Sequence, residues 1–221
     1  PDIAHLLDTS AICCLDTKEA LEDTVSLAGR IYGRILYLAD GSDALCSLPV
    51  ALDFQCGVNQ DGILPSCQVI ALTRVRTAET KAVNSRKVLV RVQYEVSLRV
   101  YQPDLLTIPC GVAQGDGVEQ RLESAEGYFV VAVPEKQFQF QDDLTLSGGQ
   151  PAIGEVLRMQ SDVTCTEAKL IGGKLVFKGE VSVRMLYRSV EEDVLTADFV
   201  LPYSQIMDAA EAAENADFQI E

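Results

Sequence analysis

The 221-residue sequence predicts an all-β fold of long antiparallel hairpins. Three observations carry this prediction. Residues 174–187 alternate apolar and polar side chains, as a strand with one buried face does, and residues 87–101 show the same period of two. The third observation is an internal repeat. In residues 174–187 the side chains on the apolar face are Leu175, Phe177, Val181, Val183, Met185 and Tyr187, and Gly179 lies on the same face.

The repeat appears when the chain is shifted against itself by 150 positions. Gly29 then falls on Gly179 and Tyr37 on Tyr187, and the match runs without a gap from Pro1 on Pro151 to Gln55 on Gln205. A repeat of this length is stronger evidence for the domain organisation than any single residue. We therefore expect a first β unit over residues 1–102, a linker or long loop over 103–127, and a second unit over 128–221 that is truncated at its C-terminus.

Each unit is expected to begin in the same way. Residues 1–7 and 151–157 place apolar side chains at helical spacing after a proline, which predicts one helical turn each. A strand over residues 10–20 should then turn near Glu22–Asp23 into the strand that ends at Tyr37. The second unit should turn at Gly172–Gly173, a dipeptide suited to the positive φ of tight hairpin turns.

A third hairpin is expected between the two copies. Residues 67–82 should run to a turn at Asn84–Ser85, and residues 87–101 should return. Asp40–Gly41–Ser42 predicts a turn into a strand over 44–55, and Glu191–Asp193 predicts its counterpart before 194–204. Together these elements favour a β-sandwich-like unit with only short helical turns.

The remaining stretches are less regular. Residues 102–127 are rich in glycine, proline and acidic side chains, without a sustained period. Residues 128–133 and 136–141 read as two strands separated by Pro134. The tail over 205–221 allows one short helix, and residues 217–221 read as the start of a strand.

The composition excludes several classes of partner. The formal net charge of −15 opposes binding to nucleic acid or to an anionic membrane surface, because a phosphate backbone requires lysine and arginine. No apolar run approaches the roughly 18 residues of a membrane span. We therefore expect no nucleic-acid and no membrane partner.

Metal and cofactor sites are not expected. The seven cysteines are irregularly spaced, and the one histidine is His5, so four close-spaced zinc ligands are hard to assemble. The cysteines are expected to be thiols in a reducing compartment rather than a disulfide framework. The acidic clusters at 40–43 and 191–193 offer weak Ca²⁺ ligands but lack EF-hand alternation, and acidic hairpin tips are the favoured interpretation.

No catalytic motif is present either. The sequence contains no Gly-x-Ser-x-Gly, P-loop or His-Glu-x-x-His string, and His5 without a partner motif is expected to be a half-exposed polar residue. The glycine-rich residues 111–117 follow no strand-to-helix unit and read as a flexible linker. We expect no enzyme and assign no catalytic residue.

Four stretches resemble a known family: residues 140–157, 173–187, 199–205 and 83–92. They are similar to the SPOCS domain of clostridial SipL-type sporulation coat proteins, in which a LysM module usually follows. The resemblance implies a non-enzymatic building block of the spore coat or envelope, located in the mother-cell cytoplasm at the forespore or coat surface, with coat morphogenetic proteins as partners.

Two further readings stay open. Long hairpins offer sheet edges to which another strand can add, so self-association through these edges is possible. The alternative function is a carbohydrate- or peptidoglycan-binding β module. Sugar sites usually carry exposed aromatic rings, whereas the repeat places the following aromatics at positions that indicate packing: Tyr37, Tyr101, Phe177, Tyr187 and Tyr203.

Overall fold

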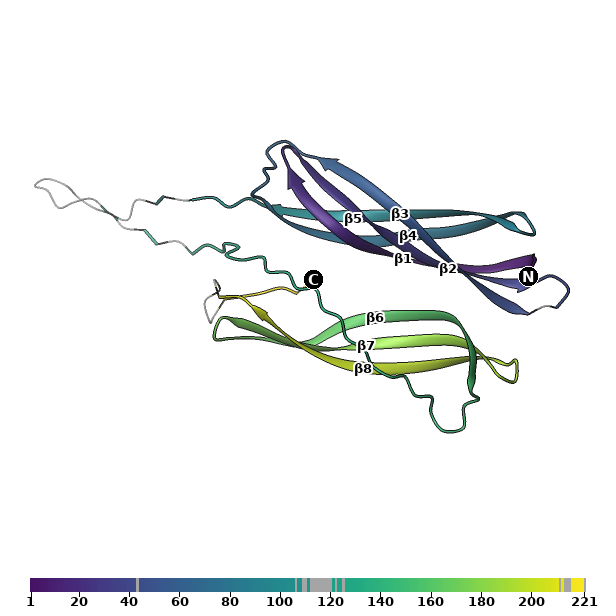
Figure 1. Cartoon of the computed structure of the whole chain (residues 1–221). Coiled ribbons are helices and arrows are strands. Elements are labelled where there is room, and N and C mark those ends of the chain that lie inside the picture. Colours follow the sequence, from purple (N-terminus) through teal and green to yellow (C-terminus); the bar gives the residue numbers. More distant parts are fainter. Residues whose placement is uncertain are drawn as a thin grey trace, which may run out of the picture.

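The computed structural model describes residues 1–42, 44–105, 107, 108, 111, 121, 123, 124, 126–210, 212 and 216–220. Within these residues the protein is all-β, every paired strand is antiparallel, and no helix occurs (Figure 1). The predicted fold class is confirmed. The strands are β1 (Ile3–Leu21), β2 (Thr24–Ala39), β3 (Leu45–Asn59), β4 (Gln68–Asn84), β5 (Lys87–Tyr101), β6 (Ile153–Ile171), β7 (Lys174–Ser189) and β8 (Val194–Asp208).

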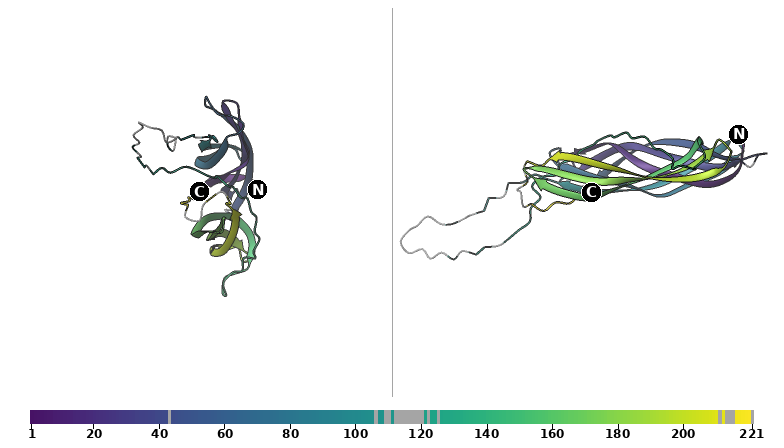
Figure 2. Two further views of the ribbon diagram at one scale, coloured as in Figure 1. Left: turned by 90° about the vertical axis from the view of Figure 1, so that its left-hand side faces the viewer. Right: turned by 90° about the horizontal axis from the view of Figure 1, so that it is seen from below.

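The first unit, strands β1 to β5, is a two-layer sandwich. The sheet β1-β2-β3 packs on the β4-β5 hairpin, and strands of both layers run along the long direction of the molecule (Figures 1 and 2). Period-two alternation places one face of each strand toward the other layer, where its burial stabilises the pair of sheets. The core consists of Ala20, Val25, Leu27 and Ile63, against which Val69, Ala71, Val96, Leu98 and Val100 pack.

The second unit, strands β6 to β8, has a different second layer. An irregular segment, residues 134–148, crosses the inner face of the sheet β6-β7-β8. Its Phe138 ring lies 6.5 Å from Phe177 and 5.8 Å from Tyr203. In the first unit the corresponding aromatic contact joins Phe54 of β3 to Tyr94 of β5 at 4.7 Å.

This segment corrects one prediction. Residues 128–133 and 136–141 form no strand. Phe138 instead packs against the core of the second sheet, and Lys136 Nζ donates a hydrogen bond to the backbone carbonyl of Ile206 at 2.6 Å, whereas Tyr128, Phe129, Val130 and Val131 are exposed. A period of two indicates extended backbone, but a strand also needs a neighbour with which to pair.

The predicted helical turns at 1–7 and 151–157 are also wrong. Strands β1 and β6 already begin at Ile3 and Ile153. Their pairing with β2 and β7 skips one residue at Leu7 and one at Leu157, so both strands contain β-bulges there. Since each bulge adds a residue, the apolar positions leave the period of two and imitate helical spacing.

The repeat holds through two strands and then slips. Leu36 pairs with Ser47, whereas the equivalent Leu186 pairs with Thr196, not with Ala197 as the ungapped match requires. The turn at 190–193 is one residue shorter than the turn at 40–44. The prediction that the repeat continues without a gap to Gln205 is therefore wrong. An offset of 150 would place the third strand one residue out of register, which would turn its core face outward.

The corrected register reveals an aromatic ring opposite a glycine in both units. Phe54 pairs with Gly29, and Tyr203 pairs with Gly179. A β-carbon on Gly29 would lie 2.7 Å from the Phe54 ring, and one on Gly179 would lie 2.5 Å from the Tyr203 hydroxyl oxygen. Only glycine leaves room for the ring, so this pair is a fixed part of the repeated plan.

Two hairpin turns occur where they were predicted, and the third lies at Ser85–Arg86, one residue after the predicted Asn84–Ser85. The chain turns at Glu22–Asp23, with Asp23 at φ 56°, and at Gly172–Gly173, with φ of 56° and 70°. After β8, residues 211 and 213–215, where the short helix was expected, lie outside the described residues, and residues 216–220 form no strand, contrary to expectation. Residue 221 and most of residues 109–120 lie outside the described residues, and the boundaries 1–102, 103–127 and 128–221 stay a prediction.

Candidate interaction surfaces

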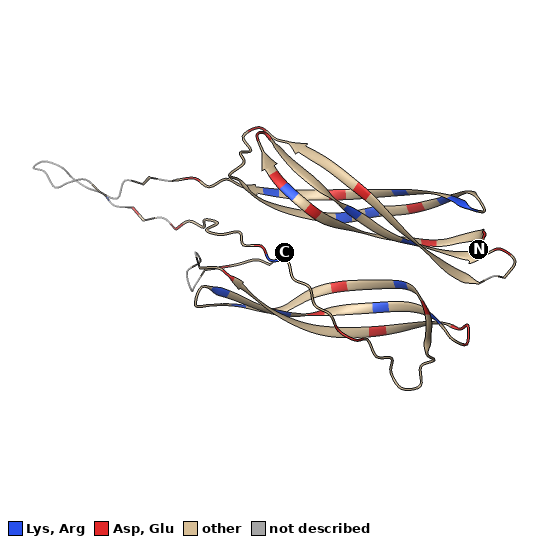
Figure 3. Ribbon diagram, in the orientation of Figure 1, with Lys and Arg blue, Asp and Glu red and all other residues tan. Residues whose placement is uncertain are grey.

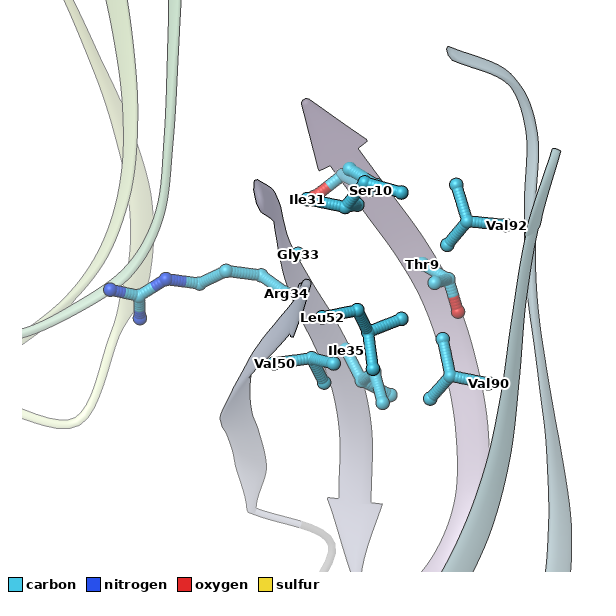
Figure 4. Close-up of a pocket in the computed structure, with 11 residues that line it drawn as sticks. Thr9, Ser10, Ile31, Gly33, Arg34, Ile35, Val50, Leu52, Val90 and Val92 are labelled. Atoms are coloured by element: carbon cyan, nitrogen blue, oxygen red, sulfur yellow. The ribbon is translucent and has the colours of Figure 1, made fainter. Parts of the chain in front are cut away.

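The two units meet at the carbonyl group of Leu157. The hydroxyl of Ser47 donates a hydrogen bond to this oxygen at 2.6 Å, and Arg34 donates a longer one at 3.4 Å. Arg34 also donates to the Ser47 hydroxyl at 3.2 Å. Figure 4 shows the Arg34 side chain leaving the first unit and pointing toward the strands of the second. The residue at the bulge of β6 is thus held by β2 and β3.

A salt bridge accompanies this contact. Arg158, next to Leu157, pairs with Asp8 of β1, and the two side chains remain 26% and 48% exposed. Leu157 is completely buried, and Leu36, between Asp8 and Ser47 in the sheet, is 5% exposed. We call these six residues the junction: Asp8, Arg34, Leu36 and Ser47 of the first unit with Leu157 and Arg158 of the second.

The junction depends on the β6 bulge. Without it, Leu157 and Arg158 would follow the pleat in strict alternation across the sheet. The additional residue re-aims the backbone, which is a common use of bulges at the edges of sheets. The sequence signal was present in the broken period at 151–157 and in the opposite charges of Asp8 and Arg158 at equivalent repeat positions, but these residues were not singled out in advance.

A second surface is the open face of β6, defined here by Met159 and Val163, whose exposed fractions are 51% and 65%. The equivalent residues of β1 are covered by β4. Thr9 shares a hydrogen bond of 2.8 Å with Thr80, and the carbonyl of Cys13 accepts one of 3.0 Å from Thr73. Burial raises the pKa of the Cys13 thiol. Among the described residues, no hairpin covers β6 in this way.

The gap between β5 and the sheet of the first unit is a packing feature. Figure 4 shows Val90 and Val92 facing Ile35 and Leu52 across it. Its lining is predominantly aliphatic, and the Arg34 guanidinium that borders it is engaged at the junction. Its polar lining residues are Thr9, Ser10 and Arg34, and no carboxylate, histidine or cysteine lines it.

The aromatic residues considered for sugar stacking are mostly packed. Tyr37, Phe177 and Tyr187 are buried, and Tyr203 contacts Phe138 and Phe177. Tyr101 is half-buried. Burial, together with the neighbouring Cys46, raises the pKa of Tyr37. The interpretation of these rings as packing residues is confirmed.

The other predicted features were placed as follows. His5 is exposed rather than half-exposed. No group of three or more metal-ligating side chains occurs among the described residues, and Asp43 lies outside them. The six described cysteines are free thiols. Cys110 and most of the glycine-rich stretch 111–117 lie outside the described part of the chain.

Charge on the strands is mixed rather than gathered into one patch. Figure 3 shows the positions of acidic and basic residues interspersed along the strands of both units. Cross-strand pairs such as Arg184 with Asp198 at 2.8 Å account for part of this pattern. No helix in the described residues is long and apolar enough to cross a membrane.

These observations define a class: an all-β protein of repeated long-stranded units, in which broad strand faces rather than an enclosed pocket are the candidate sites. The family model "SipL, SPOCS domain" matches residues 152–221. The match over residues 152–221 agrees with the SPOCS resemblance and relates the protein to sporulation. The searches of curated proteins and of solved structures returned no match.

Proposed function

We propose that this chain is a non-enzymatic structural and protein-interaction module of the spore coat or envelope. It acts in the mother-cell cytoplasm at the surface of the forespore, and its partners are coat morphogenetic proteins. The SPOCS match of residues 152–221 supports the link to sporulation. The aliphatic lining of the gap in Figure 4 supports a role without catalysis.

The observation that carries the interaction role is the open face of β6. Both units build the same three-stranded sheet, and among the described residues a hairpin lies against the leading strand of the first unit but not against that of the second. Val163, 65% exposed, occupies the position of the covered Cys13. An apolar strand face of this kind gains stability when a partner removes it from water.

The proposed ligand of this face is a β-hairpin or extended segment of a partner protein. Strand β6 is an edge strand of its sheet, so part of its backbone N–H and C=O groups point away from β7. A partner strand can bind such groups through its own backbone, while Met159 and Val163 select its side chains. The β4-β5 hairpin, a separate sheet that contacts β1 through the side chains of Thr80 and Thr73, shows in the same molecule that this strand face can accept a second layer.

Localisation during sporulation tests the proposal. A fluorescent fusion of the chain, expressed in sporulating cells of its natural host, should form a ring around the forespore. Val163→Arg should weaken that ring, because a buried guanidinium without a partner is costly. Ile12→Arg is the matched control, since Ile12 is 63% exposed on a strand of the first unit and should tolerate the change.

Three outcomes oppose the proposal. A diffuse wild-type signal would contradict the envelope role, and an unchanged ring for Val163→Arg would contradict the β6 site. Sedimentation of the purified chain with cortex peptidoglycan would favour the carbohydrate-binding alternative instead.

A further inference from the structure

The junction within the chain uses one of two equivalent bulges. Leu157 fills the junction and is completely buried, whereas Leu7, its repeat counterpart, is 55% exposed. Both residues are skipped in the pairing of their strands, between Leu6 and Asp8 in β1 and between Val156 and Arg158 in β6. The first unit therefore exposes at Leu7 the same kind of bulged leucine that the second unit buries at Leu157 in the junction.

The surface that receives the bulge also occurs twice. In the first unit, Leu36 lies between Asp8 and Ser47 across the three strands. In the second unit, Leu186 lies between Arg158 and Thr196 in the same register. The one-residue slip of β8 is what places Thr196, another hydroxyl residue, at the position of Ser47.

Exposure distinguishes the used surface from the unused one. Leu36 is 5% exposed beneath the docked bulge, while Leu186 is only half-buried and Thr196 is exposed. Arg184, at the position of Arg34, has a side chain that is 68% exposed. Its guanidinium pairs with Asp198 at 2.8 Å, which is a surface pair that contributes little to stability.

We propose that two copies of this chain associate head to tail through a repetition of the junction. The Leu7 bulge of one copy docks on the Arg158, Leu186 and Thr196 row of the next. The Thr196 hydroxyl then donates to the Leu7 carbonyl, as Ser47 donates to that of Leu157. Asp8 and Arg158 stay paired with each other within each copy, so the contact between copies rests on Leu7, Leu186 and Thr196.

Such an interface is heterologous, because each copy contributes a different surface. A heterologous contact that does not close into a ring produces an open row of subunits. This association goes beyond the proposed function and uses neither Met159 nor Val163, so either proposal can fail without the other.

The test is sedimentation velocity on the 221-residue chain from about 1 µM to about 1 mM. The average mass of the wild type should rise with concentration. Leu7→Arg and Leu186→Arg should each weaken self-association at least tenfold, since each replaces the central apolar side chain of one surface. Ile12→Arg, an equally exposed control, should associate like the wild type.

A mixture of the two variants makes the test decisive. Leu7→Arg retains the receiving surface and Leu186→Arg retains the bulge, so an equimolar mixture should form dimers and nothing larger. A wild type that remains monomeric throughout would overturn the proposal. So would a mixture that remains monomeric, or association of Leu186→Arg alone at wild-type strength. Circular dichroism melting curves matching the wild type establish that the variants are folded.

Discussion

The glycine opposite each aromatic ring should be nearly irreplaceable, and Gly179→Ala tests this most directly. A β-carbon at this position would lie 2.0 Å from the carbonyl oxygen of Thr164 and 2.5 Å from the Tyr203 hydroxyl. Ordinary contacts of a β-carbon begin near 3.4 Å. Because this oxygen belongs to the backbone of β6, strands β6 and β7 must move apart by more than about 1 Å. A backbone shift of this kind at an overpacked site lowers the free energy of unfolding considerably.

We expect Gly179→Ala to lower the free energy of unfolding by about 3 kcal/mol, the upper end of the range for overpacking. Displacement of the ring adds about 1 kcal/mol, because Tyr203 also donates a hydrogen bond to the Thr164 carbonyl at 3.3 Å. Urea unfolding followed by circular dichroism is a suitable assay, since the chain contains no tryptophan. Gly29→Ala should produce a comparable loss in the first unit.

Gly148→Ala provides the control. No atom lies within 4 Å of its added β-carbon, so the change should stay within about 0.5 kcal/mol. A double-mutant cycle with Tyr203→Ala should show a coupling of about 1 kcal/mol with Gly179→Ala. A loss below about 1 kcal/mol for Gly179→Ala would refute the steric argument.

Three other predictions concern the junction, a tyrosine and the thiols. Ser47→Ala should lower the free energy of unfolding by about 1 kcal/mol and accelerate hydrogen exchange at the start of β6, whereas the exposed Ser182→Ala should do neither. Because burial raises the pKa of Tyr37, the folded state favours its neutral phenol. Stability should therefore hold below about pH 10 and fall above it in urea titrations, and Tyr37→Phe should reduce that fall. Iodoacetamide at pH 8 should label exposed Cys165 before Cys13, whose thiol pKa burial raises, and equal rates in peptide mass spectra would contradict this order.

The predicted strands and turns are features that neighbouring residues decide. Alternation over residues 87–101 and 174–187 specifies extended backbone with one apolar face, because successive side chains of a strand point to opposite sides. Turns at 22–23 and 172–173 follow from residues that accept a positive φ. These properties need no knowledge of the neighbouring strands.

Residues 128–141 and the two bulges show where such reasoning ends. Pattern alone cannot tell a strand from an extended segment that covers a sheet, because the difference lies in whether a partner strand is available. At Leu7 and Leu157 a helical spacing was expected, yet the pairing of β1 and β6 with their neighbours produced bulges. The missing information is the long-range register of the backbone.

The sequence by itself determined that this chain is built from repeated alternating strands and that residues 152–221 resemble a SPOCS domain, because periodicity and residue pattern are properties of neighbouring residues. Only the tertiary structure decided which leucine is buried. Leu7 and Leu157 occupy the same place in the repeat, and their exposures differ because the junction partners of Leu157, Ser47 and Arg34, come from a distant part of the chain. Whether a side chain is buried depends on which residues pack against it, and a sequence repeat alone does not specify those residues.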